Sequence, residues 1–191
     1  MFNSIQNIFS KSAAYFSFNE KTLFKPLIAI ILSTVLLAIS SKIQVPLLSV
    51  PVTMQSMMVV LIGSVLGARL GALAVSVWLL EAALGLPVLA SPIGGIHYFF
   101  GPTAGYLFTF PLAAGVVGYF IKSKNYQHFV SQFIVMCLGN LIPILGGVLW
   151  LSIFLGMKQA FLIGALPFLL IGIIKSALNV ATLKIISKIK M

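Results

Sequence analysis

The sequence has 191 residues, of which 60% are hydrophobic and only 7% are charged, whereas about a quarter of a typical soluble domain is charged, so a soluble globular fold is excluded. Lys and Arg number 12 against 2 acidic residues, which leaves too few carboxylates for a carboxylate-bridged metal centre or a glycosidase pair. The net charge of +10 would suit nucleic acid, but residues 82–121 and 125–157 contain no Asp, Glu, Lys or Arg, and such runs indicate membrane spans instead.

Several kinds of chemistry have no residues to support them. The chain contains no Asp, so a Ser/His/Asp triad cannot form, and its single Cys137 can build neither an internal disulfide nor a cysteine zinc site. No Walker-type GxxxxGK[ST] loop occurs, so ATP that drives transport must be hydrolysed by another protein. We therefore expect that the chain is not an enzyme and binds no metal and no cofactor.

The chain divides into a leader and a membrane domain. Residues 1–22 are polar and aromatic, lack the apolar core and cleavage site of a secretory signal, and favour an amphipathic surface helix. Residues 23–191 contain six apolar segments, which predict an all-α integral membrane protein built as a six-helix transmembrane bundle. Their limits are residues 23–39, 53–66, 70–84, 103–121, 129–154 and 166–186. The second and third are short, and Gly67 and Gly71 flank Arg69 between them, so we expect a tight turn there.

Basic residues predict the orientation, because cytoplasmic flanks carry the excess of Lys and Arg. With both termini in the cytoplasm, the outer loops hold only Lys42 and Lys158. The inner flanks then hold nine basic residues: Lys11, Lys21, Lys25, Arg69, Lys122, Lys124, Lys184, Lys188 and Lys190. We therefore expect a multi-pass protein of the cell membrane with both termini cytoplasmic.

Two outer loops, residues 45–53 and 85–105, are apolar and rich in Pro and Gly. Irregular backbone at membrane depth is stable only where protein buries it or where it lines a cavity, so we expect both loops to fold over a ligand pocket. Gly94 and Gly95 either let the backbone approach a ligand or permit a turn.

Two charged residues fall within predicted spans, and such residues are candidates for function. Glu81 lies near the outer end of the third span, and Lys175 lies in the sixth, about 12 Å beyond a helix start at Pro167. A buried ammonium needs a carboxylate, from Glu81 or from a ligand, or several carbonyl oxygens. A structural pair of Glu81 and Lys175 without any ligand is the alternative.

Other polar residues share the region of Lys175. Asn179 follows Lys175 by one helical turn, Thr53 and Gln55 begin the second span, and Tyr106 begins the fourth. Helix starts offer unpaired backbone N–H groups that suit an anionic or carbonyl-bearing ligand, although an N-cap role explains Thr53 as well.

The first span carries Ala29 and Ser33, a small-xxx-small pair that lets another helix approach closely. Packing inside the bundle and docking of a membrane partner both explain such a pair.

Taken together, the motifs resemble the BioY family, the biotin-specific substrate-capture (S) components of energy-coupling factor (ECF) transporters. The resemblance covers residues 27–183 and includes the pair Gly94 and Gly95. Its longer motifs are PVTMQ (51–55), LGARLGAL (66–73), WLLEAALGLPVLA (78–90), GPTAGYLFTFPLAA (101–114) and PFLLIGIIKSAL (167–178).

This resemblance implies a six-helix S-component that captures biotin outside the cell, in a pocket of outer loops and outer helix halves. It also implies an energising module made of a transmembrane coupling protein and two ATPase subunits. The family's AxxxA-like docking motif is matched by Ala29 and Ser33, with Ser in place of the second Ala.

The last-helix motif of the family resembles PFLPGDLLK, in which Asp and Lys contact the vitamin. Lys175 matches the Lys, whereas Gly172 stands at the Asp position. We expect Thr53, Gln55, Lys175 and Asn179 to contact a biotin-like ligand, with Glu81 pairing with Lys175 or replacing the missing Asp. An S-component for a different small vitamin and a self-sufficient vitamin carrier are the alternatives.

Overall fold

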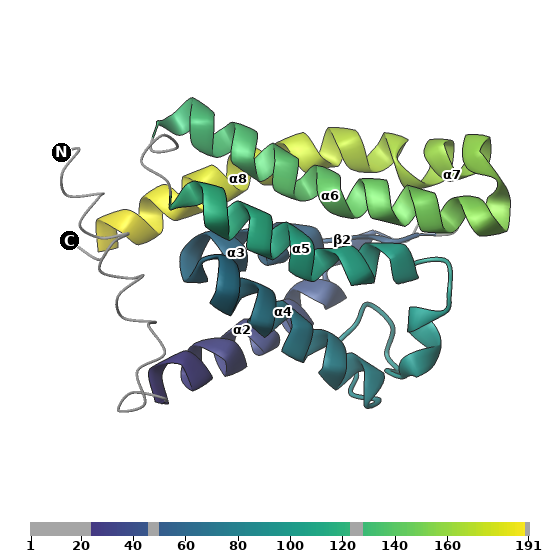
Figure 1. The fold of residues 1–191 in the computed structure, drawn as a ribbon, viewed down its shortest axis with the longest axis horizontal. Helices are drawn as coiled ribbons and strands as arrows, with labels where there is room; N and C mark the ends of the chain where they lie inside the picture. The colour runs from purple at the N-terminus through teal and green to yellow at the C-terminus, as the bar shows by residue number, and fades with distance from the viewer. Residues whose placement is uncertain (1–23, 46–49, 123–127, 190–191) are drawn as a thin grey trace.

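The computed structural model describes residues 24–45, 50–122 and 128–189, which are mostly helical (Figure 1). The predicted leader, residues 1–22, lies outside them. The long helices are α2 (Phe24–Lys42), α3 (Gln55–Leu66), α4 (Ala68–Ala83), α5 (Ala104–Ile121), α6 (Phe129–Leu155), α7 (Met157–Gly164) and α8 (Leu166–Ile189). A short 3-10 helix, η2 (Ile96–Phe99), precedes α5.

A two-stranded antiparallel sheet joins the region after α2 to the region before α3. Strand β1 (Gln44–Val45) pairs with β2 (Val52–Thr53), with Gln44 opposite Thr53. Because β2 leads directly into α3, the sheet holds the first turn of α3 beside the end of α2.

All six predicted apolar segments are helical, but the predicted count of six membrane spans is not confirmed. In the described ranges, four helical stretches are long and apolar enough to cross a membrane: Phe24–Lys42, Ala104–Ile121, Phe129–Leu155 and Met157–Ser187. Helices α3 and α4 have 12 and 16 residues. At 1.5 Å per residue they reach only about 18 and 24 Å, less than a bilayer core of about 30 Å. Helix α7 was not expected as a separate element.

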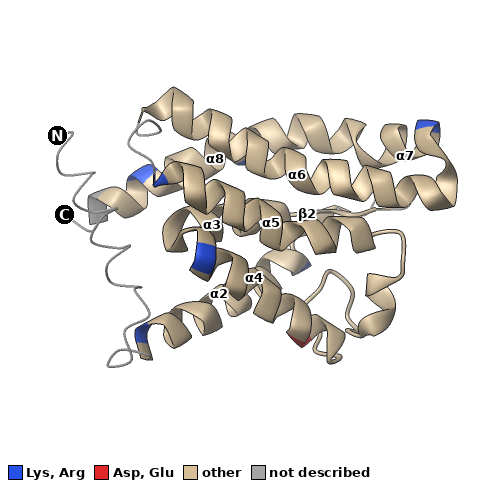
Figure 2. Ribbon diagram, in the orientation of Figure 1, with Lys and Arg blue, Asp and Glu red and all other residues tan. Residues whose placement is uncertain are grey.

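Basic residues gather toward one end of the helix bundle. Lys25 and Arg69 lie in the first turns of α2 and α4, and Lys122 and Lys184 lie close to the ends of α5 and α8. We call this end of the bundle, on the left of Figure 2, the basic end. Helices α3 and α5 begin at the opposite end, which we call the cavity end. Of the other basic residues in the described ranges, Lys42 ends α2, Lys158 lies in α7 and Lys175 lies within α8.

Near the basic end, α3, α4 and α5 pack through glycine. The predicted tight turn is present, since Gly67 alone separates α3 from α4 and has a φ of +87°, which only glycine adopts readily. A Cβ on Gly63 of α3 would collide with the Ala114 backbone of α5, and one on Gly118 would collide with backbone of Gly67 and Ala68. Close backbone contact of this kind is typical of helices packed in a membrane.

The outer surface of the bundle is apolar. Helix α2 packs against α3 and α4 on one side and exposes large aliphatic side chains on the other. The exposed residues of α2 include Leu27, Ile28, Ile31, Leu32, Val35, Leu36 and Ile39. Such a surface suits hydrocarbon rather than water.

Candidate functional site

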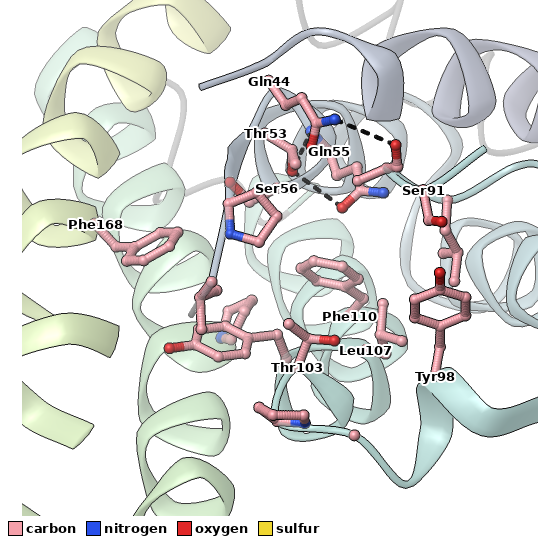
Figure 3. A pocket seen from close by; sticks show the side chains of 18 of the residues that line it. Gln44, Thr53, Gln55, Ser56, Ser91, Tyr98, Thr103, Leu107, Phe110 and Phe168 are labelled. Atoms are coloured by element: carbon pink, nitrogen blue, oxygen red, sulfur yellow. Dashed lines mark hydrogen bonds between the residues drawn. The ribbon is translucent and has the colours of Figure 1, made fainter. Parts of the chain in front are cut away.

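A cavity of about 560 Å³ opens at the cavity end (Figure 3). Its walls come from the first turns of α3 and α5, the middle of α6, the first half of α8 and the two apolar loops. Residues from all these elements line it, among them Val50, Thr53, Gln55, Ser56, Leu89, Ser91, His97, Tyr98, Thr103, Tyr106, Phe110, Asn140, Phe168, Gly172 and Lys175. This volume lies within the range of about 300–1,000 Å³ that is usual for small-molecule sites.

Residues at the end of α2 and just after it hold the second apolar loop, residues 85–105, over the cavity. The Lys42 ammonium donates to Leu89 O at 2.7 Å and to Ser91 O at 2.8 Å, and Gln44 Nε2 donates to Ala90 O at 3.3 Å. Since Leu89, Ala90 and Ser91 line the cavity, these three bonds hold one wall in place.

Lys175 is the most buried charge of the cavity wall, with a side chain only 4% exposed. Helix α8 begins at Leu166, so Lys175 lies more than two turns inside it, as the sequence predicted. The ammonium donates to Thr53 O at 2.6 Å and to Ser56 Oγ at 3.0 Å. An ammonium has three N–H donors, so one remains for a ligand.

The first turn of α3 presents a linked pair of polar side chains. The Thr53 hydroxyl donates to Gln55 Oε1 at 3.0 Å, and Thr53 Oγ accepts from the Gln55 backbone N–H at 3.4 Å. Figure 3 shows both side chains at the cavity with Ser56 beside them. The hydroxyl bond fixes the Gln55 amide, with its NH₂ group on the other side.

Aromatic side chains from α5 and α8 form the apolar part of the wall. Tyr106 and Phe168 stack with ring centroids 5.7 Å apart, and Phe110 continues the surface along α5. The Tyr106 hydroxyl donates to Gly164 O at 2.7 Å, which ties α5 to the end of α7. Tyr106 therefore offers its ring to a ligand while its hydroxyl is engaged.

The structure does not pair Glu81 with Lys175. Glu81 is half-buried in the last turn of α4 and is not among the residues of the cavity wall. Helix α8 packs against α3, α6 and α7, so Lys175 reaches the oxygen atoms at the start of α3 instead. The ammonium is stabilised by a carbonyl and a hydroxyl rather than by the carboxylate.

Three other predicted site residues also lie outside the cavity wall. A Cβ on Gly94 would collide with Leu86 O, and Gly95, with a φ of +139°, donates its N–H to Ala82 O at 2.8 Å. Both glycines therefore let the loop fold back on the end of α4. Asn179 is fully buried and does not line the cavity, and its amide has no hydrogen-bond partner within the described ranges.

The small pair of α2 faces into the bundle. Ser33 is buried and donates to Ala29 O at 2.7 Å, and Ala29 packs against the hydrophobic core. Within the chain this pair packs in the bundle, and docking of a membrane partner at the pair stays a prediction.

Several cavity residues were not expected from the sequence. Ser56 follows Gln55 in the first turn of α3, and its contact with Lys175 depends on how α8 crosses α3. Asn140 had a usable signal, because it is an amide in the middle of a long apolar segment. Polar residues in membrane spans face the protein interior by default.

The chain is similar to several known proteins. The sequence pattern described as the BioY family matches residues 11–190. The chain is 37% identical over 142 residues to a probable biotin transporter BioY of Pyrococcus horikoshii, covering 74% of this chain and 83% of that protein. It is 32% identical over 161 residues to the biotin transporter BioY2 of Lactococcus lactis, covering 83% and 88%.

A solved structure is also similar. The S-component for biotin from an ECF-type ABC transporter superposes with a TM-score of 0.75 and 27% identity, covering 91% of this chain and 95% of that one. The family pattern and these similar proteins cover most of the chain, and the chain therefore belongs to the BioY family.

Proposed function

We propose that this chain captures biotin at the outer face of the cell membrane, as the S-component of an ECF transporter that takes up the vitamin. The observation that carries the proposal is the cavity itself, which combines an apolar wall with a single buried ammonium. Biotin has matching parts, a polar cyclic urea fused to an apolar thiophane ring, which carries an aliphatic tail that ends in a carboxylate. Relatives with the same fold are named biotin transporters, which supports the same ligand here.

In the proposed complex, Lys175 donates its third N–H to the ligand, and the Gln55 NH₂ group adds a second donor. Thr53 and Ser56 hold these donors in place through their contacts with Gln55 and Lys175. The rings of Tyr106, Phe110 and Phe168 provide the apolar wall. Preorganised donors in a largely apolar pocket give both affinity and selectivity.

The proposed orientation has both termini cytoplasmic, with α3 and α4 completing a six-helix transmembrane bundle through their loops. The basic end then faces the cytoplasm, which agrees with the usual excess of Lys and Arg on that side. The cavity opens to the outside, where the vitamin is captured.

We also propose that uptake requires an energising module made of a transmembrane coupling protein and two ATPase subunits, and that this chain performs no catalysis itself. The absence of a Walker-type loop and of any Asp from the sequence supports a separate ATPase.

Gly172 supports a second candidate, an S-component for a different small vitamin. Gly172 lines the cavity at the position where the family motif has Asp, so one expected acceptor is missing from α8.

A competition experiment separates these candidates. Purified protein is loaded with labelled biotin, and unlabelled biotin, thiamine and riboflavin compete for it. Displacement by biotin alone is expected. Failure to bind biotin, with tight binding of either other vitamin, would reject the proposed ligand and leave the capture function.

A further inference from the structure

A chain of hydrogen bonds joins α6 to α8 in the cavity wall. Asn140 Nδ2 donates to Met136 O at 3.1 Å and to Ser176 Oγ at 3.1 Å, and Ser176 Oγ donates to Gly172 O at 2.7 Å. The Met136 carbonyl can only accept, and the Ser176 hydrogen is directed to Gly172. The nitrogen end of the Asn140 amide must therefore face these two oxygens, which fixes the orientation of the amide.

This orientation leaves Asn140 Oδ1 as a buried acceptor with no partner in the described part of the chain. The Asn140 side chain is 4% exposed and belongs to the cavity wall. Buried polar atoms in native proteins nearly always have a hydrogen bond, so an orphaned oxygen at a ligand cavity points to a donor on the ligand.

Gly172 makes room for such a donor. A Cβ built on Gly172 would meet only Asn140 Cβ, at 3.8 Å, so the cavity wall is open beside Asn140. Lys175 lies one turn further along α8 and also lines the cavity. Asn140 on α6 and Lys175 on α8 thus line the same cavity.

We propose that Asn140 is a specificity-determining residue, whose Oδ1 accepts a hydrogen bond from a ring N–H of the ligand. It supplies from α6 the acceptor that Gly172 cannot supply from α8. The ligand class that satisfies both sides is a cyclic urea, whose N–H meets Asn140 while its carbonyl oxygen meets Lys175. This inference rests on the proposed capture of biotin and adds the residue that selects the ureido ring.

The test measures binding to the purified full chain by titration calorimetry, with biotin and with biotin methylated at one or the other ureido nitrogen. The wild type is expected to bind one methylated derivative about tenfold more weakly than biotin, because methylation removes the N–H that meets Asn140. Asn140→Leu is expected to bind biotin about tenfold more weakly and to lose this discrimination between biotin and the derivative.

Asn179→Leu is the matched control, since Asn179 is an equally buried Asn of α8 that does not line the cavity. It should keep the wild-type affinity and the wild-type discrimination. Gly172→Asp places a carboxylate beside Lys175, and in the Asn140→Leu background it should restore most of the lost affinity.

Unchanged discrimination in Asn140→Leu would overturn the role of Asn140. Equal binding of biotin and both derivatives by the wild type would overturn it as well, and that result requires no variant to fold. A wild type that binds no biotin would instead reject the proposed function on which the inference rests. Asn140→Ala, measured in the same way, replaces Asn140→Leu if a thermal melt shows that the leucine variant is unfolded.

Discussion

The two ends of the helix bundle differ in how closely their helices approach. Near the basic end, Gly63, Gly71 and Gly118 bring the backbones of α3, α4 and α5 into contact. At the cavity end, the first turns of α3 and α5 stand far enough apart to leave about 560 Å³ between them, α6, α8 and the loops.

This difference explains how a cavity of that size can persist. A cavity is destabilising, and the surrounding structure lowers the cost by collapsing where it can. Helices locked together at one end by backbone contact have little freedom to tilt toward each other at the other end. The basic end thus acts as a rigid base, and the cavity end is free to be shaped for a ligand.

Overpacking the basic end should have the largest effect. A Cβ on Gly118 would collide with backbone atoms of Gly67 and Ala68, which cannot move aside as a side chain can. We expect Gly118→Ala to lower the free energy of unfolding by about 3 kcal/mol, measured as thermal or denaturant unfolding in detergent.

Gly115→Ala is the matched control on the same helix. Its Cβ would lie 3.7 Å from Ala72 Cβ, an ordinary contact, so we expect unchanged or slightly higher stability. Equal losses at the two positions would mean that the close backbone contact at Gly118 is not what makes α5 sensitive to a Cβ, and the proposed rigid base would be wrong.

Removing the buried charge of Lys175 should weaken ligand binding at the cavity end without unfolding the protein. Lys175→Ala deletes the donor to Thr53 O and Ser56 Oγ and the third N–H proposed to meet the ligand. We expect the dissociation constant for biotin to rise about 10- to 100-fold, as measured by calorimetry.

Lys184→Ala is the control, because Lys184 lies on the same helix at the basic end, where its Nζ is 4.4 Å from the Phe129 ring centroid. Its affinity for biotin should equal that of the wild type. Undiminished affinity in Lys175→Ala would remove Lys175 from the site.

Loosening the loop should have a smaller effect at the cavity end. Lys42→Met removes two bonds that hold Leu89 and Ser91, so biotin should dissociate about three- to tenfold faster in a stopped-flow chase. Lys158→Met, a change at an exposed lysine of α7, should leave the rate unchanged. If the two variants release biotin equally fast, the loop wall does not depend on Lys42.

The sequence predicted correctly those features that depend on one helix alone, such as where a helix begins and ends. Apolar runs predicted six of the long helices to within a few residues. The turn predicted from Gly67 and Gly71 around Arg69 is made by Gly67 alone, since Arg69 and Gly71 lie within α4. Helix α7 was missed because it has only 8 residues and contains Lys158 and Gln159, so it carries no long apolar run. A helix start is likewise a local property, so Thr53, Gln55 and Tyr106 could be assigned to one end of the bundle in advance.

Contacts between helices decide which residues line the candidate site, and the periodicity of the sequence does not predict those contacts. Lys175 and Asn179 share a helix face and differ by one turn, yet the cavity includes the first and excludes the second. The depth of the cavity is determined by how α6 and α3 cross α8. For the same reason, the sequence alone could not show that Glu81 lies outside the site. The packing of α8 against α3 brings Lys175 to the oxygen atoms at the start of α3 instead.

The smallest predicted effect concerns the pH dependence of the basic end. Lys122 folds its side chain over Gly67 and donates to Leu66 O at 3.3 Å, and burial lowers the pKa of its ammonium from the usual 10.5. Because the pKa is lower in the folded than in the unfolded chain, the unfolded chain binds more protons between the lowered pKa and 10.5, and stability rises with pH across that window. Lys122→Met removes this titration, so its unfolding free energy should rise less with pH than that of the wild type, both measured in detergent from neutral pH to about 10. The difference should be small, because the side chain remains partly exposed and water compensates much of the burial. Parallel pH profiles would show that the Lys122 ammonium is fully solvated, and the base of the bundle would then rest on glycine packing alone.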